Sequence, residues 1–209
     1  MKYHLGCGSK ILGGYYNIDS IERPGVGADK IINLLDMTFA DDVEEIRSHH
    51  VFEHFGYVDS VYLLMKWGTV LDIGGVIRIE IPDIVAITDR FRIADIEEQT
   101  KIMRLLFGDQ TNEFSFHKMM WTEEMLRNHL SKCGFDWIET KRTGCIKNKQ
   151  PNLSMEISFK KTVQKESKEL LEHACALLAL LANAPYGRDK YEHYIAQLSW
   201  RLIKDGFQI

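Results

Sequence analysis

The sequence is poor in several features that mark specialised classes of protein. Its 209 residues include only four prolines, and no run of about 18 uncharged apolar residues occurs. These absences argue against a Pro-rich disordered chain and against a membrane span. No apolar signal core follows Met1. The four cysteines are widely spaced without a CxxC pair, which is typical of reduced thiols, so we expect a cytoplasmic protein.

The chain also lacks an excess of positive charge. Its formal net charge is −4, from 26 Lys and Arg against 30 Asp and Glu. The overall field of such a chain does not attract nucleic-acid phosphates or an anionic membrane. We therefore expect neither as a partner. A composition of 45% hydrophobic and 27% charged residues is otherwise ordinary for a globular protein.

Strand-like and helix-like runs alternate along most of the chain. Strand patterns cover residues 3–5, 15–18, 30–34, 45–51, 76–81, 135–140 and 154–160, and helix patterns cover 58–71, 84–93, 95–107 and 122–134. This alternation predicts a mostly parallel sheet covered on both faces, an α/β fold of three α/β/α layers. Because the last two strands are joined without a helix, we expect the last strand to pair antiparallel.

The composition changes after the last strand pattern. Leucines and alanines recur at helical spacing from Leu170 to Leu181, a break follows at residues 183–187, and a second helix pattern ends near Leu202. We therefore expect a domain of residues 1–160 followed by a helical hairpin within residues 161–209. The pattern leaves open whether the hairpin covers the sheet domain or joins two copies into a homodimer.

A glycine-rich turn follows the first strand directly, in the run HLGCGSK from His4 to Lys10. Glycines there allow a sharp turn and a close approach of the backbone to a ligand. The third glycine of a dinucleotide fingerprint is replaced by Ile11, which disfavours a nicotinamide dinucleotide. Asp19 ends the second strand pattern, where a carboxylate can accept hydrogen bonds from both ribose hydroxyls.

A run of polar residues follows the fourth strand pattern. His50, Glu53 and His54 match H-x-x-E-H, the inverted zincin signature, in which helical spacing brings two histidines to one zinc ion. The residues before His50 read as a strand rather than as a long helix. A zinc hydrolase is therefore a remote alternative, and we expect these groups to face a ligand-binding crevice without a metal.

The motifs taken in order resemble a known family. The runs HLGCGSK…GGYYNID, HHVFEHF, GGVIRIEIPD and FHKMMWTEEMLRNHLSKCGF are similar to class I S-adenosylmethionine-dependent methyltransferases. They resemble in particular the small predicted methyltransferases associated with cell-surface glycan synthesis. The resemblance covers about residues 3–160. It implies a Rossmann-like fold whose seven-stranded sheet is mostly parallel, with the last strand inserted antiparallel.

The resemblance also implies S-adenosylmethionine as the cofactor. The residues that it assigns to this cofactor are Gly6, Cys7 and Gly8 for the methionine part, Asp19 for the ribose, Asn33 and Leu34 for the adenine, and His50 for the sulfonium. Asn33 stands where an acidic residue is usual, and Lys10 stands at the third glycine of the usual GxGxG. These two departures keep open a second hypothesis, a non-catalytic binding or assembly module with the same fold.

The methyl acceptor is expected to be a small molecule or a glycan. In-line transfer to an oxygen or nitrogen atom needs alignment of that atom and a base for its proton. The candidates for the base are His54, Asp83 and His117. Each of them also has a structural interpretation, because His54 can cap a helix, Asp83 after Pro82 fits a helix N-cap, and His117 fits a loop histidine.

Overall fold

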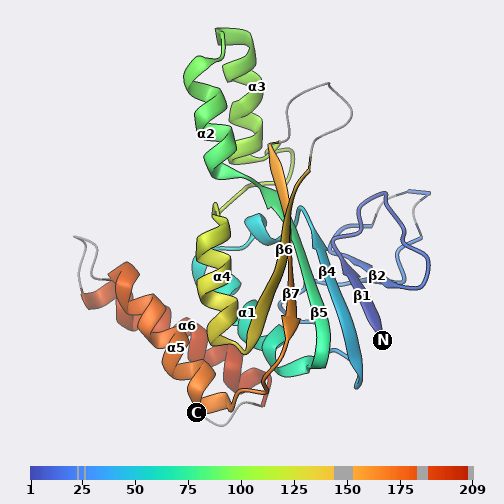
Figure 1. Ribbon diagram of the computed structural model, residues 1–209, viewed down its shortest axis with the longest axis vertical. Coiled ribbons are helices and arrows are strands. Elements are labelled where there is room, and N and C mark those ends of the chain that lie inside the picture. Colours follow the sequence, from blue (N-terminus) through green and yellow to red (C-terminus); the bar gives the residue numbers. More distant parts are fainter. Residues whose placement is uncertain (23, 26, 144–152, 183–187, 207–209) are drawn as a thin grey trace.

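The computed structural model describes residues 1–22, 24–25, 27–143, 153–182 and 188–206. A seven-stranded sheet with the strand order β3-β2-β1-β4-β5-β7-β6 forms its centre (Figure 1). The strands are β1 (Lys2–Leu5), β2 (Tyr16–Asp19), β3 (Lys30–Ile31), β4 (Val43–His49), β5 (Leu71–Pro82), β6 (Phe135–Thr143) and β7 (Ser154–Lys161). Strands β1 to β5 are parallel, and β7 is inserted antiparallel between β5 and β6. The predicted sheet is confirmed.

Six α-helices and one 3₁₀ turn complete the described chain. They are the turn η1 (Phe52–His54) and the helices α1 (Tyr57–Val70), α2 (Ile84–Ile93), α3 (Ile96–Phe107), α4 (Glu123–Lys132), α5 (Ser167–Ala182) and α6 (Arg188–Lys204). Helix α4 begins as its sequence predicts, because the Thr122 side chain accepts a 3.1 Å hydrogen bond from the Met125 amide. Within the described ranges, no helix has the length and apolar character needed to cross a membrane.

Helices cover one face of the sheet (Figure 1), whereas three α/β/α layers with helices on both faces were expected. Helices α1, α4, α5 and α6 lie on one side of the sheet, and α2 and α3 form a hairpin beyond the end of β5 (Figure 1). The connections from β1 to β2, β2 to β3 and β3 to β4 contain no helix in their described residues. Among the described residues, the second face of the sheet in Figure 1 therefore has no helical layer.

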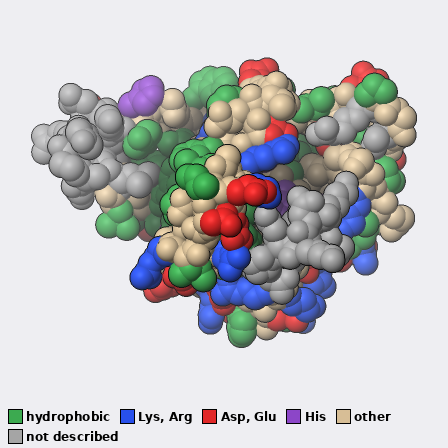
Figure 2. All heavy atoms as spheres, turned by 90° about the horizontal axis from the view of Figure 1, so that it is seen from above, with side chains coloured by type: hydrophobic (Ala, Val, Ile, Leu, Met, Phe, Trp, Pro, Cys, Tyr) green, Lys and Arg blue, Asp and Glu red, His purple; other side chains and the backbone are tan. Residues whose placement is uncertain are grey.

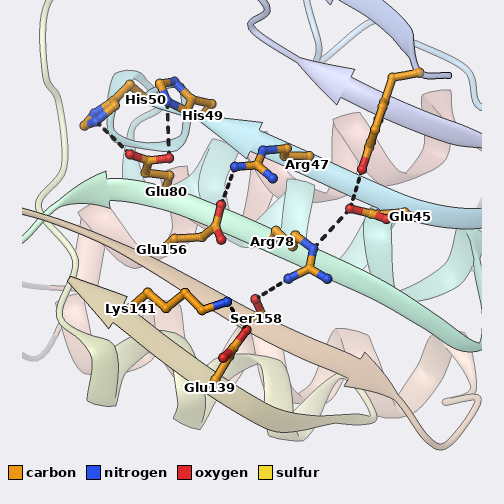
Figure 3. A network of polar contacts seen from close by, with 11 residues as sticks. Glu45, Arg47, His49, His50, Arg78, Glu80, Glu139, Lys141, Glu156 and Ser158 are labelled. Atoms are coloured by element: carbon orange, nitrogen blue, oxygen red, sulfur yellow. Dashed lines mark hydrogen bonds and ion pairs between the residues drawn. The ribbon is translucent and has the colours of Figure 1, made fainter. Parts of the chain in front are cut away.

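That second face of the sheet carries charged side chains (Figure 3). Along β4 and β5, buried isoleucines alternate with charged residues such as Arg47 and Arg78, as expected for a sheet with one solvated face. The charged groups pair across strands (Figure 3). Arg78 Nε donates to Glu45 Oε1 over 3.1 Å, and Arg47 Nη2 donates to Glu156 Oε2 over 2.5 Å. This pairing neutralises the charges of the open face within the chain.

The C-terminal hairpin covers α1 of its own chain. Six side chains of the hairpin belong to the same hydrophobic core as the sheet, namely Leu170, Ala174, Leu177, Leu178, Leu198 and Leu202. Two ion pairs border this contact, with Arg201 Nη2 2.6 Å from Asp59 Oδ1 and Lys66 Nζ 2.7 Å from Asp205 Oδ2. The apolar side of the hairpin therefore packs on the sheet domain of its own chain, a point that the sequence left open.

The far end of the α2–α3 hairpin is exposed. Its apolar side chains Ile93 and Ile96 are 76% and 78% exposed. Viewed from that end of the molecule, hydrophobic side chains lie beside charged ones of both signs (Figure 2). This mixture agrees with the near balance of charges in the sequence, and no field of a single sign dominates this view.

A buried histidine of α4 makes the stability depend on pH. His129 is 5% exposed and packs on Trp121, with ring centroids 5.4 Å apart. Burial, together with the charge of His173, lowers the pKa of His129 to about 4. The unfolded chain binds this proton at about pH 6.5, well before the folded chain does. The free energy of unfolding should therefore fall with decreasing pH, by about 1–2 kcal/mol between pH 7 and pH 5 from this residue.

Urea unfolding of a His129→Gln variant at the two pH values tests this expectation. The variant should show a smaller pH dependence than the parent protein. His193→Gln is the control for the substitution itself, because His193 lies exposed on α6. Equal pH dependence in the parent and in His129→Gln would contradict the prediction.

Candidate functional site

A cavity of about 400 Å³ opens where β1, β2 and β4 end. Its wall includes all seven residues that the sequence assigned to a cofactor, which are Gly6, Cys7, Gly8, Asp19, Asn33, Leu34 and His50. The carboxyl ends of parallel strands are the usual ligand-binding edge of an open α/β sheet. The fold therefore brings together residues that lie as far apart in the sequence as Gly6 and His50.

Two glycines of the turn after β1 have backbone conformations that favour glycine, with φ of +67° at Gly6 and +52° at Gly8. A Cβ atom at Gly6 would lie 1.7 Å from Val51 Cγ2, so this position must be glycine for the turn to pack against the end of β4. A Cβ atom at Gly8 would meet no atom within 4 Å. The backbone at Gly8 therefore faces open space in the cavity wall.

Asp19 is held in place by the backbone at the end of β2. Its Oδ2 accepts a 2.7 Å hydrogen bond from the Gly8 amide, and its Oδ1 accepts a 3.0 Å hydrogen bond from the Ile21 amide. The residue is only 5% exposed. Each carboxylate oxygen can accept more than one hydrogen bond, so this fixed carboxylate can also accept from ligand hydroxyls.

Asn33 and Leu34, which follow β3, also line this cavity. The Asn33 side-chain oxygen accepts a 3.0 Å hydrogen bond from the Leu35 amide, which turns the chain just after β3. The wall also contains residues that were not predicted from the sequence, among them Phe55 and Asp59 near the start of α1. No local motif marks these two residues, and Asp59 reaches the wall through the tertiary placement of α1.

A second cavity, of about 590 Å³, adjoins the first. Four residues line both cavities, namely Ile21, His50, His54 and Phe114. The wall of the second cavity also contains Glu53 and His117, and α3 contributes Lys101 and Arg104. Two of the three predicted catalytic residues, His54 and His117, thus lie near each other, with ring centroids 4.7 Å apart.

His50 and Glu53 form a pair between β4 and α1. Nδ1 of His50 lies 3.0 Å from Oε1 of Glu53, which is 1% exposed. Burial opposes the charged form of His50, but the hydrogen bond and charge of Glu53 outweigh it and raise the pKa of His50. Burial likewise opposes ionisation of Glu53, and the same bond, with the charges of His50 and His54, lowers the pKa of Glu53. The pair therefore favours a protonated imidazole beside an ionised carboxylate.

His54 and His117 are oriented by backbone carbonyl groups. Nδ1 of His54 lies 3.0 Å from the Phe116 oxygen, and Nδ1 of His117 lies 2.9 Å from the Leu105 oxygen. Because a carbonyl oxygen only accepts, each Nδ1 carries the hydrogen, and Nε2 of the neutral ring keeps a lone pair. Burial lowers the pKa of His117, although Glu53 opposes this. The two Nε2 atoms can therefore accept a proton or coordinate a cation.

Asp83 lies apart from these histidines. Its Oδ1 accepts hydrogen bonds from the Val85 and Ala86 amides over 3.1 and 3.2 Å, so it caps α2, and it also contacts Arg142. It lines a different cavity, of about 710 Å³, together with Trp137. The structure therefore does not bring Asp83 together with His54 and His117, because the cap bonds direct its carboxylate to its own helix.

The H-x-x-E-H run does not lie on a helix of the kind that an inverted zincin needs. Only Phe52, Glu53 and His54 form a turn, which is a 3₁₀ turn, and His50 precedes it with φ of +51°. The two histidines of the run therefore do not share one helix face. This arrangement removes the structural basis of the zinc hydrolase alternative.

Solved structures of S-adenosylmethionine-dependent methyltransferases resemble this chain. A methyltransferase from Methanosarcina mazei matches with 15% identity and a TM-score of 0.54, over 78% of this chain and 92% of its own. The 1,6-didemethyltoxoflavin-N1-methyltransferase of Burkholderia thailandensis, solved with S-adenosylhomocysteine, matches with 13% identity and a TM-score of 0.53, over 78% and 71%. No protein-family model and no curated protein matches the chain. The likeness shows that the chain has the Rossmann-like methyltransferase fold.

Proposed function

We propose that this protein is an S-adenosylmethionine-dependent methyltransferase. The observation that carries the proposal is the hydrogen bond from the Gly8 amide to Asp19, which joins the glycine turn and the strand-end carboxylate in the wall of one cavity. In a methyltransferase fold, this cavity lies at the ligand-binding edge of the sheet. The adjoining cavity of about 590 Å³ would then hold the acceptor.

The residues present fit the cofactor. The open backbone at Gly8 leaves room for the methionine part, and the fixed carboxylate of Asp19 can accept from the ribose hydroxyls. Leu34, which is 5% exposed, offers an apolar surface for the adenine, and Asn33 lies beside it. Cys7 and His50 also line this cavity, and His50 lines the second cavity as well.

The protein itself must bind the acceptor, align it and remove the proton of the acceptor atom. When bound, the cofactor supplies a methyl group activated by a positively charged sulfur atom. Alignment of the acceptor atom alone can contribute about 7–11 kcal/mol to lowering the barrier. His54 lies in the wall that the two cavities share, and His117 lies beside it, so both are proposed to contact the acceptor.

The acceptor is proposed to be a small molecule or a terminal sugar of a glycan. The volume of the second cavity suits a group of that size, and Lys101 and Arg104 from α3 lie in its wall, where they can contact a negatively charged substituent. The association with glycans comes from the sequence resemblance. Incubation with radiolabelled cofactor and a panel of sugars and small hydroxylated acids tests this part, because only true acceptors should gain label.

A non-catalytic binding module is the second candidate. It is favoured by Asn33, whose side-chain oxygen already accepts from the Leu35 amide and which carries no charge for the adenine amino group. Turnover of any acceptor that is lost in a His54→Ala variant would exclude this alternative.

Calorimetric titration with S-adenosylhomocysteine tests the proposed cofactor. We expect the parent protein to bind it and Asp19→Ala to bind it about 10- to 100-fold more weakly, because hydrogen bonds to a charged group are lost. Asp89→Asn is the control, since Asp89 is exposed on α2 away from the cavity. Circular dichroism confirms that each variant is folded. No binding by the parent, or equal binding by Asp19→Ala, would contradict the proposal.

A further inference from the structure

We infer that Glu53, His54 and His117 bind a divalent transition-metal ion in the wall of the second cavity. One potential ligand atom from each of these residues lies within 4.8 Å of the other two. Glu53 and His54 belong to the turn η1, and His117 comes from the loop between α3 and α4. The role of the ion in the reaction rests on the proposed function, whereas the binding of the ion does not.

Both histidines are oriented as metal ligands usually are. A metal-bound histidine generally donates its second ring N–H to a carbonyl or carboxylate group, which fixes the ring and directs the other nitrogen to the ion. His54 and His117 donate in this way to the Phe116 and Leu105 carbonyl oxygens. Their Nε2 atoms are therefore presented with lone pairs.

Glu53 supplies an independent indication of a missing partner. The residue is 1% exposed, and no hydrogen-bond partner for its buried Oε2 exists among the described residues. An unsatisfied buried carboxylate oxygen is costly unless a cation or a donor compensates for it. His50 holds the other oxygen at 3.0 Å and so acts as a positioning residue for the carboxylate. A cation beside Oε2 would satisfy the remaining oxygen.

The ligand types select the class of ion. Two imidazoles and one carboxylate suit Zn²⁺, Mn²⁺, Fe²⁺ or Co²⁺, whereas Mg²⁺ prefers an octahedral shell of oxygens. Three protein ligands leave coordination positions open, as in catalytic rather than structural sites. Glu53, His54 and His117 all line the second cavity, so an exchangeable ligand would be bound from that side.

The ion would activate the acceptor at the site of transfer. If bound there, the ion would lower the pKa of an acceptor hydroxyl, which would then release its proton to solvent. The acceptor oxygen then forms a bond to the methyl carbon while the carbon–sulfur bond breaks, and the electron pair of that bond stays on the sulfur atom. The products are the methylated acceptor, S-adenosylhomocysteine and one released proton, so atoms and charge balance.

Metal titration of the tag-free full-length protein tests this inference. After removal of metal with a chelator, ZnCl₂ or CoCl₂ is titrated by calorimetry, and the visible spectrum of bound Co²⁺ reports nitrogen and oxygen ligands. We expect one equivalent of either ion to bind, and MgCl₂ to bind far more weakly. His54→Ala and His117→Ala should each weaken Zn²⁺ binding at least about 10-fold, which corresponds to about 1.4 kcal/mol.

His193→Ala serves as the matched control, because His193 is exposed on α6 and away from the site. It should bind Zn²⁺ as the parent protein does. Because both ligand histidines are more exposed than Glu53, their variants should stay folded, and circular dichroism checks this. Absence of stoichiometric binding by the parent, or undiminished binding by both ligand variants, would overturn the inference.

Titration of the metal-free protein with S-adenosylhomocysteine separates the two proposals. Cofactor-product binding without stoichiometric metal binding would overturn the metal site and leave the proposed function standing. Metal binding that His54→Ala and His117→Ala weaken, without binding of S-adenosylhomocysteine, would support the site and contradict the proposed cofactor.

Discussion

The Gly6→Ala variant is expected to lose about 2–4 kcal/mol of unfolding free energy and its binding of S-adenosylhomocysteine. The φ of +67° at Gly6 strains any L-residue, which contributes about 1 kcal/mol. The new Cβ atom would also lie 1.7 Å from Val51 Cγ2, and such overpacking adds about 1–3 kcal/mol. Relief of this contact requires movement of the turn or of the end of β4, and both form the proposed cofactor cavity.

Urea unfolding followed by circular dichroism, together with calorimetry, measures both effects. Gly14→Ala is the matched control, because Gly14 has φ of +81° but open space around its Cβ position, so it should lose only about 1 kcal/mol. Combining Gly6→Ala with Val51→Ala should restore part of the stability, since Val51 Cγ2 is then absent. Equal losses in Gly6→Ala and Gly14→Ala would contradict the expected clash with Val51.

Leu178→Ala is expected to lose about 3 kcal/mol of unfolding free energy. Leu178 of α5 is fully buried in the core that the hairpin shares with α1 and the sheet, and its truncation leaves a cavity there. Leu180→Ala, two residues further along the same helix, should change stability by less than about 0.5 kcal/mol, because Leu180 is 72% exposed. Urea unfolding compares the two variants, and equal losses would contradict the packing of α5 on α1.

Deletion of residues 162–209 tests whether the predicted domain of residues 1–160 folds without the C-terminal hairpin. Because the hairpin covers α1, the shortened chain would expose buried apolar surface of that helix, and we expect it to lose cooperative unfolding. A shortened chain that unfolds with the cooperativity and stability of the parent would show instead that the hairpin is an independent appendage.

Much of the order of elements follows from local pattern. The helix predicted at residues 84–93 matches α2, and the strand predicted at 154–160 matches β7 within one residue. The strand predicted at 30–34 is shorter, because the Asn33 side chain bonds the Leu35 amide and turns the chain. The strand predicted at 45–51 ends at His49, because His50 adopts a positive φ. Side-chain bonds and single dihedral angles set such ends, and hydrophobic periodicity does not report them.

The prediction that helices cover both faces of the sheet was wrong for one face (Figure 1). Alternating strands and helices usually imply helices on both faces, but here the polar residues Glu45, Arg47 and His49 alternate with buried ones along β4. That alternation is a local signal for a strand with one solvated face. The partners that pair with the charged side chains of β4 are Arg78 on β5 and Glu156 on β7, the next two strands of the sheet, and only the strand order brings them within reach of β4.

The sequence by itself determined the glycine turn, the carboxylate at the end of β2 and the fold that joins them. The turn and the carboxylate are marked by the spacing of residues within one short run, and the fold is marked by the order of the strand and helix patterns along the chain. Only the tertiary structure decided that Asp83 and His117 line different cavities, that the hairpin covers α1, and that His117 joins Glu53 and His54. A contact between distant residues depends on how the intervening helices and strands pack together, and no short run of the sequence contains that information.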